Sequence, residues 1–139
     1  MRANLGGLRQ TGSGYFTGSA DEAYETIRQS TTDVESIASN MGIKPTNIQK
    51  VKQHLFYAEH LLDRYVHVGV PAEMRRFDSA LGLANAWKRL EQGNETAADR
   101  QLLRHEAAEA YLMRKWHDQS YNRAHTRVQK RFPAPHLEE

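Results

Sequence analysis

The sequence predicts an all-α fold, a compact single-domain bundle of about six helices with a flexible N-terminal arm. Two observations lead to this prediction. Apolar residues recur at spacings of three and four through most of the chain, and several segments open with residues that cap helices. The length of 139 residues suits one domain with one core. No apolar run approaches the roughly 20 residues of a membrane span, so we expect a soluble domain without a membrane segment.

The two ends of the chain differ in composition from the middle. Residues 1–18 are rich in Gly, Ser and Thr and have no sustained period, which predicts a flexible arm or linker. The helical domain is predicted over 19–133. Residues 134–139 then form a short tail.

Three segments match the capping box, in which a hydroxyl and a later polar side chain satisfy free amides of the first helical turn. They predict helices that open at Ser19, Thr32 and Thr46. The second of these helices is expected to end at Gly42, because glycine tolerates the left-handed backbone that closes a helix. The apolar spacing of the third helix continues to Leu62, which predicts one long buried face.

The second half of the chain begins with a break in this pattern. Residues 64–77 combine side chains typical of extended backbone with a glycine and a proline, which predicts a loop or small hairpin. Three further helices are predicted from their cap and stop residues: one from Asp78 to Gly93, one from Thr96, and one from Ser120 to Pro133.

Composition narrows the functional classes. The chain has no cysteine, which excludes disulfides and thiolate metal ligands. Its 19 basic and 17 acidic residues give a net charge of +2, far from the charge of a dedicated phosphate-binding tail. Basic residues are concentrated near the C-terminus. A phosphate-binding surface there is one interpretation, and an ordinary solvated helix face is the other.

The segment IASNMGIKPTNIQKVKQHLF has the spacing of a helix-turn-helix, with a small residue where the helices touch, glycine in the turn and two apolar anchors. It resembles a DNA-reading motif whose second helix would present Asn47, Gln49, Lys50 and Lys52 to nucleic acid. The same pattern describes any two tightly packed helices. A nucleic-acid-binding module is therefore an alternative function.

Histidines mark another candidate site. His54 and His60 lie six residues apart, and a regular helix turns their side chains about 120° from one another. We therefore do not expect these two residues to bind one metal ion by themselves. One of them could still face the core and meet residues from another helix.

The segment LLRHEAAEAYLMRKW places His105 and Glu109 on the apolar stripe of a helix, with Glu106 at its edge. Because burying a lone carboxylate is costly, Glu109 should have a partner, and His105 lies one turn away. We expect the stripe to meet the helix that contains His54 and His60, where it would form a polar pocket.

The residues HEAAE differ from the HExxH signature of zinc peptidases in one ligand, which is Glu109 here. One interpretation is a HExxE-type metallopeptidase in which His105 and Glu109 bind the metal. A second is a buried His–Glu pair that only joins helices. A third is an acid–base site that works without metal or with loose assistance from it.

Six short motifs are spread over about residues 27–133: VKQHLF, EH, RRFD, AWKRLEQG, DRQLLRHEAAE and RAHTRVQKRFP. In this order they resemble a helical domain found at the C-terminal end of bacterial polymorphic toxins and of phage head-morphogenesis proteins fused to such toxins. The resemblance implies a toxic effector tip, delivered by a larger parent chain and paired with an immunity protein. It carries over to the polar residues of the motifs, which are His54, His60, Asp78, Trp87, Arg89, His105, Glu106, Glu109 and His125.

Residues and resemblance together favour a toxin domain that attacks nucleic acid, with RNA as the expected substrate, in the cytoplasm of a target cell. The expected acid–base residues are His54, His60, His105, Glu106 and Glu109. The expected substrate-binding residues are Lys50, Lys52, Arg89, Arg104 and His125. This chemistry requires no cofactor, although a divalent metal at His105 and Glu109 is an alternative. A phage-assembly module without catalysis is the structural alternative.

Overall fold

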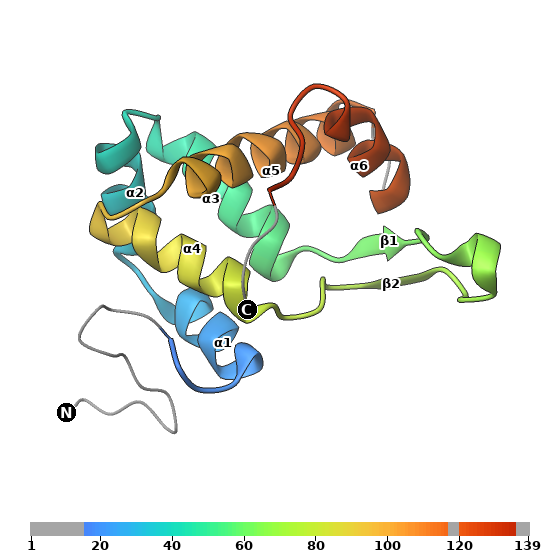
Figure 1. Ribbon diagram of the computed structural model, residues 1–139, viewed down its shortest axis with the longest axis horizontal. Helices are drawn as coiled ribbons and strands as arrows, with labels where there is room; N and C mark the ends of the chain where they lie inside the picture. The colour runs from blue at the N-terminus through green and yellow to red at the C-terminus, as the bar shows by residue number, and fades with distance from the viewer. Residues whose placement is uncertain (1–15, 117–119, 136–139) are drawn as a thin grey trace.

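The computed structural model describes residues 16–116 and 120–135, and within them the fold is all-α (Figure 1). Its six α-helices are α1 (Ala20–Gln29), α2 (Asp33–Met41), α3 (Pro45–Lys52), α4 (Leu81–Gln92), α5 (Ala97–Lys115) and α6 (Tyr121–Gln129). The predicted fold class is confirmed. Among the described residues, no helix has both the length and the apolar character needed to cross a membrane.

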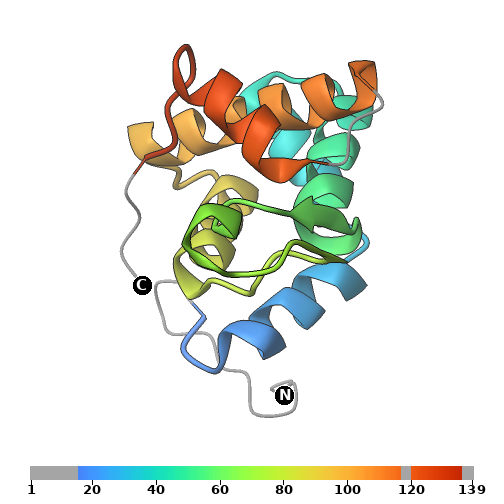
Figure 2. The same cartoon turned by 90° about the vertical axis from the view of Figure 1, so that its right-hand side faces the viewer.

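A small antiparallel hairpin separates α3 from α4. A π-helical turn (Gln53–Tyr57) continues α3, after which β1 (His60–Leu62) pairs with β2 (Glu73–Arg75). A 3-10 turn (Val66–Val68) lies between the two strands. The hairpin projects from one end of the helical body (Figure 1), and from that end it is seen between α1 and the α5–α6 pair (Figure 2).

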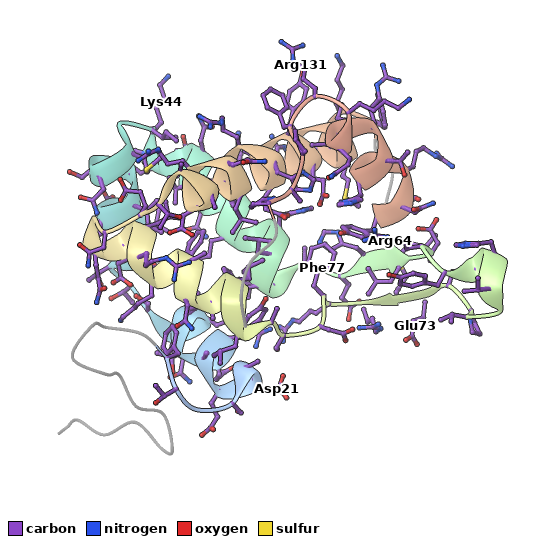
Figure 3. All side chains as sticks on the ribbon, viewed as in Figure 1. Asp21, Lys44, Arg64, Glu73, Phe77 and Arg131 are labelled. Carbon is purple, nitrogen blue, oxygen red and sulfur yellow. The ribbon has the colours of Figure 1, made fainter. Side chains whose placement is uncertain are left out.

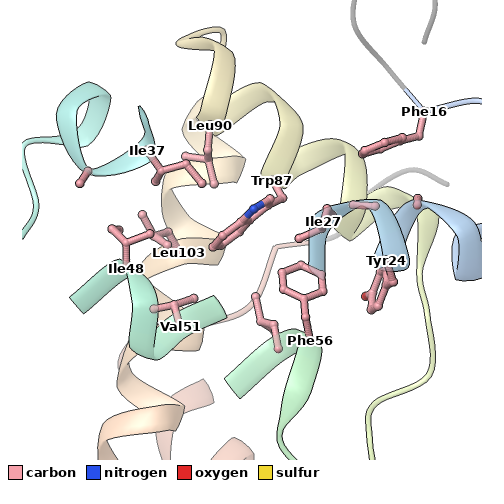
Figure 4. Close-up of a cluster of buried hydrophobic side chains, with 14 residues drawn as sticks. Phe16, Tyr24, Ile27, Ile37, Ile48, Val51, Phe56, Trp87, Leu90 and Leu103 are labelled. Atoms are coloured by element: carbon pink, nitrogen blue, oxygen red, sulfur yellow. The ribbon is translucent and has the colours of Figure 1, made fainter. Parts of the chain in front are cut away.

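The hydrophobic core lies between α1, α2, α3 and α4, and Leu103 of α5 closes one side of it (Figure 4). Phe56 of the π-helical turn is fully buried, and its ring packs edge-on against Tyr24 and Trp87 at centroid distances of 4.8 and 5.3 Å. Burying a side chain of this kind contributes about 1.5–3 kcal/mol. The core therefore fixes the π-helical turn in place, and with it the start of the hairpin.

Phe16 belongs to this core, although it falls within the predicted arm. Its side chain is only 4% exposed, and its backbone amide donates a hydrogen bond to Asn85 Oδ1 at 2.7 Å. Residues 1–15 of the predicted arm and residues 136–139 of the predicted tail lie outside the described residues.

Several helix ends fall where the cap residues predict them. Ser19 and Thr96 each complete a capping box, and Ser120 accepts a hydrogen bond from an amide of the first turn of α6. Helices α2 and α4 end at Gly42 and Gly93, whose φ angles of 67° and 77° are left-handed. A side chain there would be strained, so these glycines stop their helices.

Two of the three predicted capping boxes were partly or wholly wrong. Helix α2 begins after Thr32 as expected, but Thr32 makes no cap hydrogen bond, and the neighbouring Asp33 side chain turns into the core. Helix α3 begins at Pro45, so Thr46 is already helical and cannot cap it. Proline suits the first helical position because its missing amide would have no partner there.

The predictions around the hairpin also need correction. The third helix does not continue to Leu62, because the π-helical turn ends it and the next residues pair as β1. Asp78 does not cap α4, which begins after Ala80; its carboxylate instead forms an ion pair with Arg75 at 2.7 Å. Helix α6 ends at Gln129, four residues before the predicted stop at Pro133.

Candidate functional site

Glu109 of α5 is the centre of a buried cluster of histidines and glutamates. Its carboxylate accepts hydrogen bonds from His105 Nε2 at 2.8 Å, His125 Nδ1 at 2.8 Å and His54 Nε2 at 3.1 Å. The three imidazoles come from α5, α6 and the π-helical turn. Glu109 has no exposed surface, so its charge is neutralised by these partners rather than by water. The prediction that Glu109 needs partners, and meets the segment of His54, is confirmed.

Helical spacing places His105 directly beside Glu109, because residues i and i+4 are neighbours on one face of a helix. The other ring nitrogen of His105, Nδ1, donates a hydrogen bond to the backbone carbonyl of Phe132 at 2.6 Å. Both ring nitrogens therefore face oxygen acceptors. In the absence of a metal ion, this arrangement requires the doubly protonated, charged form of His105.

The π-helical turn brings His54 and His60 together. Their ring centroids lie 4.6 Å apart, and His60 Nε2 donates a hydrogen bond to the backbone carbonyl of His54 at 2.8 Å. The expected divergence of the two side chains was wrong because it assumed a regular helix, whereas His60 lies in β1. Burial lowers the pKa of His60, whose ring also stacks on Phe77 at 4.5 Å.

The position of His125 depends on how α6 is anchored. Asp63, just after β1, accepts hydrogen bonds from Ser120 Oγ at 2.7 Å and from the Asn122 amide at 3.0 Å. This carboxylate therefore fixes the N-terminus of α6 against the hairpin. His125 lies one turn further along α6, where its Nδ1 is 3.3 Å from the hydroxyl of Tyr121, the first residue of the helix.

The electrostatics of the cluster move its two carboxyl groups in opposite directions. Burial would raise the pKa of Glu109, but its three imidazole partners hold that pKa well below the usual range. Burial raises the pKa of Glu106, and the nearby Glu109 charge adds to the effect. Two neighbouring carboxyls with separated pKa values are typical of acid–base sites.

The charges of Glu106 and Glu109 also change the pKa values of the histidines. Burial would lower the pKa of His54, but hydrogen bonds and charge interactions with Glu106 and Glu109 raise it to about 9. Burial also opposes protonation of His105, yet its hydrogen bonds to Glu109 and to the Phe132 carbonyl raise its pKa. The His54 ring is therefore charged near neutral pH.

A cavity of about 320 Å³ reaches the cluster from the side of the hairpin. Glu106 and Tyr121 line its inner end, and Arg64, Tyr65 and Phe77 line its walls. Arg64 and Phe77 lie on the side of the hairpin that faces α6 (Figure 3). Burial raises the pKa of Tyr121, and the charges of Glu109 and Glu106 raise it further. The cavity thus joins acid–base groups to an exposed arginine and aromatic rings.

Two further hollows border the cluster. One of about 390 Å³ is lined by His54, His60 and Lys50, together with apolar side chains of α5. The other, of about 320 Å³, contains His125 and shares Arg64 with the cavity at Glu106. All five predicted acid–base residues belong to this one region.

The predicted substrate-binding residues are more dispersed. Arg89 binds the buried carboxylate of Asp99 through two hydrogen bonds of 2.6 and 2.8 Å. Lys52 is 4% exposed and forms an ion pair with Asp33 at 2.9 Å. Arg104 is exposed on α5, whereas Lys50 and His125 border hollows of the cluster.

Helices α2 and α3 pack as the helix-turn-helix spacing predicts, but α3 presents only part of the predicted reading surface. Asn47, Gln49 and Lys50 are exposed, whereas Lys52 points into the core. Helix α3 is also only 8 residues long before the π-helical turn replaces it. These features weaken the helix-turn-helix alternative.

Sequence reasoning missed four residues of the region: Asp63, Arg64, Phe77 and Tyr121. The interrupted pattern at 64–77 predicted a loop or small hairpin but gave no register, and without a register the facing side chains could not be assigned. The serine cap of α6 did predict the start of the helix that carries Tyr121 and His125.

The cluster contains two groups of three residues whose ligand atoms all lie within 4.8 Å of one another. They are His105, Glu109 and His125, and His54, Glu106 and Glu109. Imidazole nitrogen and carboxylate oxygen are ligands that divalent transition metals accept in proteins. Either group could therefore hold a metal ion.

Comparison with known proteins found no matching family model, no matching curated sequence and no matching solved structure. The resemblance to toxin domains therefore stays a prediction from the sequence motifs.

Proposed function

We propose that this chain is a toxic effector domain that cleaves nucleic acid, with RNA as its substrate, by acid–base chemistry at the histidine–glutamate cluster. The position of Glu106 carries the proposal. Its carboxyl group is almost fully buried, lies 3.5 Å from His54 Nε2, and borders a cavity that also contains Arg64. A carboxyl group in this position is placed to exchange a proton with a substrate in the cavity.

Cleavage of a ribose-phosphate chain needs a base for the 2′-hydroxyl, a proton for the leaving oxygen and a cation for the phosphate. Glu106 is the proposed base. Charged His54 lies 3.5 Å away and favours the ionised form of Glu106 that can act as a base. As the bond from the 2′-oxygen to phosphorus forms and the bond from phosphorus to the leaving oxygen breaks, Glu106 passes the proton it has taken to the leaving oxygen. Arg64 binds the phosphate, and the Tyr65 ring beside it, exposed on the cavity wall, offers a surface on which a base can stack.

The toxin part of the proposal is supported by the motif resemblance. Delivery by a larger parent chain and neutralisation by an immunity protein belong to the same proposal. Expression of the wild-type chain in a bacterial cytoplasm should arrest growth, and expression of Glu106→Gln should not.

The direct test is RNA degradation by the purified chain. Glu106→Gln keeps the shape of the side chain but removes its proton-accepting charge, so cleavage should fall by about a hundredfold or more. Glu91→Gln is the matched control. Burial also raises the pKa of Glu91, but this residue lies on α4 near Lys88 and Lys52, away from the cavity. It should keep full activity.

The outcome that contradicts the proposal is equally direct. If the wild-type chain leaves RNA and DNA intact, or if Glu106→Gln cleaves as fast as Glu91→Gln, the cluster is not the site of nucleic-acid cleavage. Cleavage of an unfolded protein substrate in place of RNA would instead support the peptidase alternative.

A further inference from the structure

We propose that His105, Glu109 and His125 form a binding site for one divalent transition-metal ion, with Zn²⁺ as its representative. Their ligand atoms are His105 Nε2, Glu109 Oε2 and His125 Nδ1, and each nitrogen lies 2.8 Å from the same carboxylate oxygen. Two imidazoles and one carboxylate, with a fourth position open, are the ligand set of many catalytic zinc sites. Without cysteine, the chain offers such an ion only nitrogen and oxygen ligands of this kind.

The two contacts of Glu109 Oε2 need little adjustment to admit an ion, and the three ligand atoms all lie within 4.8 Å of one another. Ligand atoms bound about 2.0 Å from a tetrahedral zinc ion lie about 3.3 Å from one another. The two ring nitrogens would therefore move outward from Glu109 Oε2 by about 0.5 Å. The ion takes the place of the protons that now join these rings to the carboxylate, so binding releases protons.

The two ligands on α5 are held from outside the ligand set. His105 Nδ1 donates to the Phe132 carbonyl, which fixes the ring with Nε2 directed at the site. Glu109 Oε1, the oxygen not assigned to the ion, accepts from His54 Nε2 at 3.1 Å. Outer contacts of these two kinds, imidazole to carbonyl and carboxylate to donor, orient the ligands of natural metal sites.

The third ligand is placed by tertiary structure. His125 comes from α6, whose N-terminus is fixed by Asp63, and its ring lies 5.0 Å from that of His105. The His125 side chain is 13% exposed and borders an open hollow, whereas His105 and Glu109 are buried. An ion therefore has an entry path on the His125 side.

The neighbouring group of His54, Glu106 and Glu109 fits an ion less well. Its spacing also suits an ion, since His54 Nε2 lies 3.5 Å from Glu106 and 3.1 Å from Glu109. However, it offers one imidazole and two carboxylates, whereas cysteine-free catalytic zinc sites use two or three imidazoles. Assigning His54 to the ion would also remove the outer contact that orients Glu109. We therefore assign His54 as a positioning residue.

The assignment explains how the segment HEAAE, with only one histidine, can contribute to a site like that of the HExxH pattern. Glu109 replaces the second histidine of the HExxH pattern, and His125 supplies the missing imidazole. Glu106 follows the first ligand and stays free at the cavity, as the base does in that pattern. A role of the ion in RNA cleavage rests on the proposed function, whereas ion binding itself does not.

Calorimetric titration of the chelator-treated full chain with ZnCl₂ tests the site. The wild-type chain should bind one ion. His125→Ala should weaken binding by more than the 10- to 100-fold typical of a lost outer contact, and His54→Ala should weaken it within that range. The matched control is His67→Ala, which removes an exposed histidine from the hairpin and should bind like the wild type.

The unfolding temperature, measured with and without Zn²⁺, gives a second readout of ion binding for each variant and shows whether the variant is folded. The ion should raise the unfolding temperature of the wild type and of His67→Ala, but not that of His125→Ala. His125→Gln serves as a second variant if the alanine variant does not fold.

Absence of Zn²⁺ binding by the wild type would overturn the proposal, as would unchanged affinity in a folded His125 variant. Loss of binding in His54→Ala with full binding in His125→Ala would move the ion to the other group and also overturn it. The proposed function fails separately: Zn²⁺ binding without RNA cleavage leaves the metal site standing and removes the nuclease. RNA cleavage without Zn²⁺ binding does the reverse.

Discussion

Among the described residues, the buried polar cluster around Asp33 and the one around Glu109 share most of their physical features. The Asp33 carboxylate accepts hydrogen bonds from Lys52 Nζ and Trp87 Nε1, each at 2.9 Å. Lys52 also donates to the Ser30 carbonyl at 3.0 Å. In both clusters a fully buried carboxylate is surrounded by donors from several helices, as buried charge requires.

The difference between the clusters is their contact with cavities. Asp33, Lys52 and Trp87 lie among the packed side chains of α2, α3 and α4. The Glu109 cluster borders three hollows, through Glu106, His54 and His125. Burial and satisfied hydrogen bonds are common to both clusters and cannot by themselves indicate function. Contact with a cavity distinguishes the candidate site from a structural ion pair.

The largest effect we predict comes from breaking the Asp33 cluster. Lys52→Met keeps the apolar stem but removes the cation, which leaves Asp33 as an uncompensated buried charge. The free energy of unfolding should fall by about 3–5 kcal/mol. Urea denaturation measures this change.

The same variant tests the comparison itself. If the Asp33 cluster is only structural, the folded fraction of Lys52→Met should cleave RNA at the wild-type rate. A folded Lys52→Met chain with normal stability and no activity would show that the two clusters are not separated in role.

The sequence predicted the Glu109 cluster in part, because the cost of burying a carboxylate is a local rule. The stripe on α5 required partners for Glu109, and the structure supplies His54 as expected. The close contact of His60 with His54 could not be predicted, since it depends on the π-helical turn that ends α3. Arg64 and Tyr121 come together only through the path of the hairpin and the docking of α6, which are not encoded in local periodicity.

The Asp33 cluster shows where a local sequence pattern gave a wrong prediction. Thr32-Asp33-Val34-Glu35 matched a capping box, and that pattern assigned Glu35 to the helix end. Asp33 has two strong tertiary donors, which hold its side chain inward. The backbone of the neighbouring Thr32, with φ −120° and ψ −13°, is not in the extended form of a cap residue, and its hydroxyl makes no cap hydrogen bond. Tertiary hydrogen bonds to a charged group outweigh a cap that contributes about 1 kcal/mol.

A smaller effect is predicted for the Arg89–Asp99 pair, a third buried carboxylate that also borders none of the hollows around Glu109. Burial would raise the pKa of Asp99, but hydrogen bonds from Arg89 and Thr96 lower it below the unfolded value of 3.8. Its stabilising contribution is therefore full above about pH 5, and it is lost as the pH falls through the unfolded and then the folded pKa.

Urea unfolding of the wild type and of Asp99→Asn at a series of pH values measures this contribution. The difference in the free energy of unfolding should be largest near neutral pH and should shrink on acidification. Arg89→Gln should lose the same acid-dependent part, because it removes the cation that lowers the pKa. A difference that stays constant down to about pH 3 would contradict the assignment.

The smallest effect is predicted for Lys50, which lies two residues before Lys52 on α3 but is exposed. Lys50→Ala should change the free energy of unfolding by no more than about 0.5 kcal/mol, in contrast to Lys52→Met.

Lys50 lines the hollow that contains His54 and His60, so it can meet a phosphate there. In the Glu106→Gln background, where RNA stays intact, Lys50→Ala should weaken RNA binding and lower the slope of log affinity against log salt by about one. Lys44→Ala, at the other end of α3, is the matched control and should leave the slope unchanged. Equal slopes for both variants would mean that RNA contacts the cluster only from the hairpin and α6, where Arg64 lines two of the hollows.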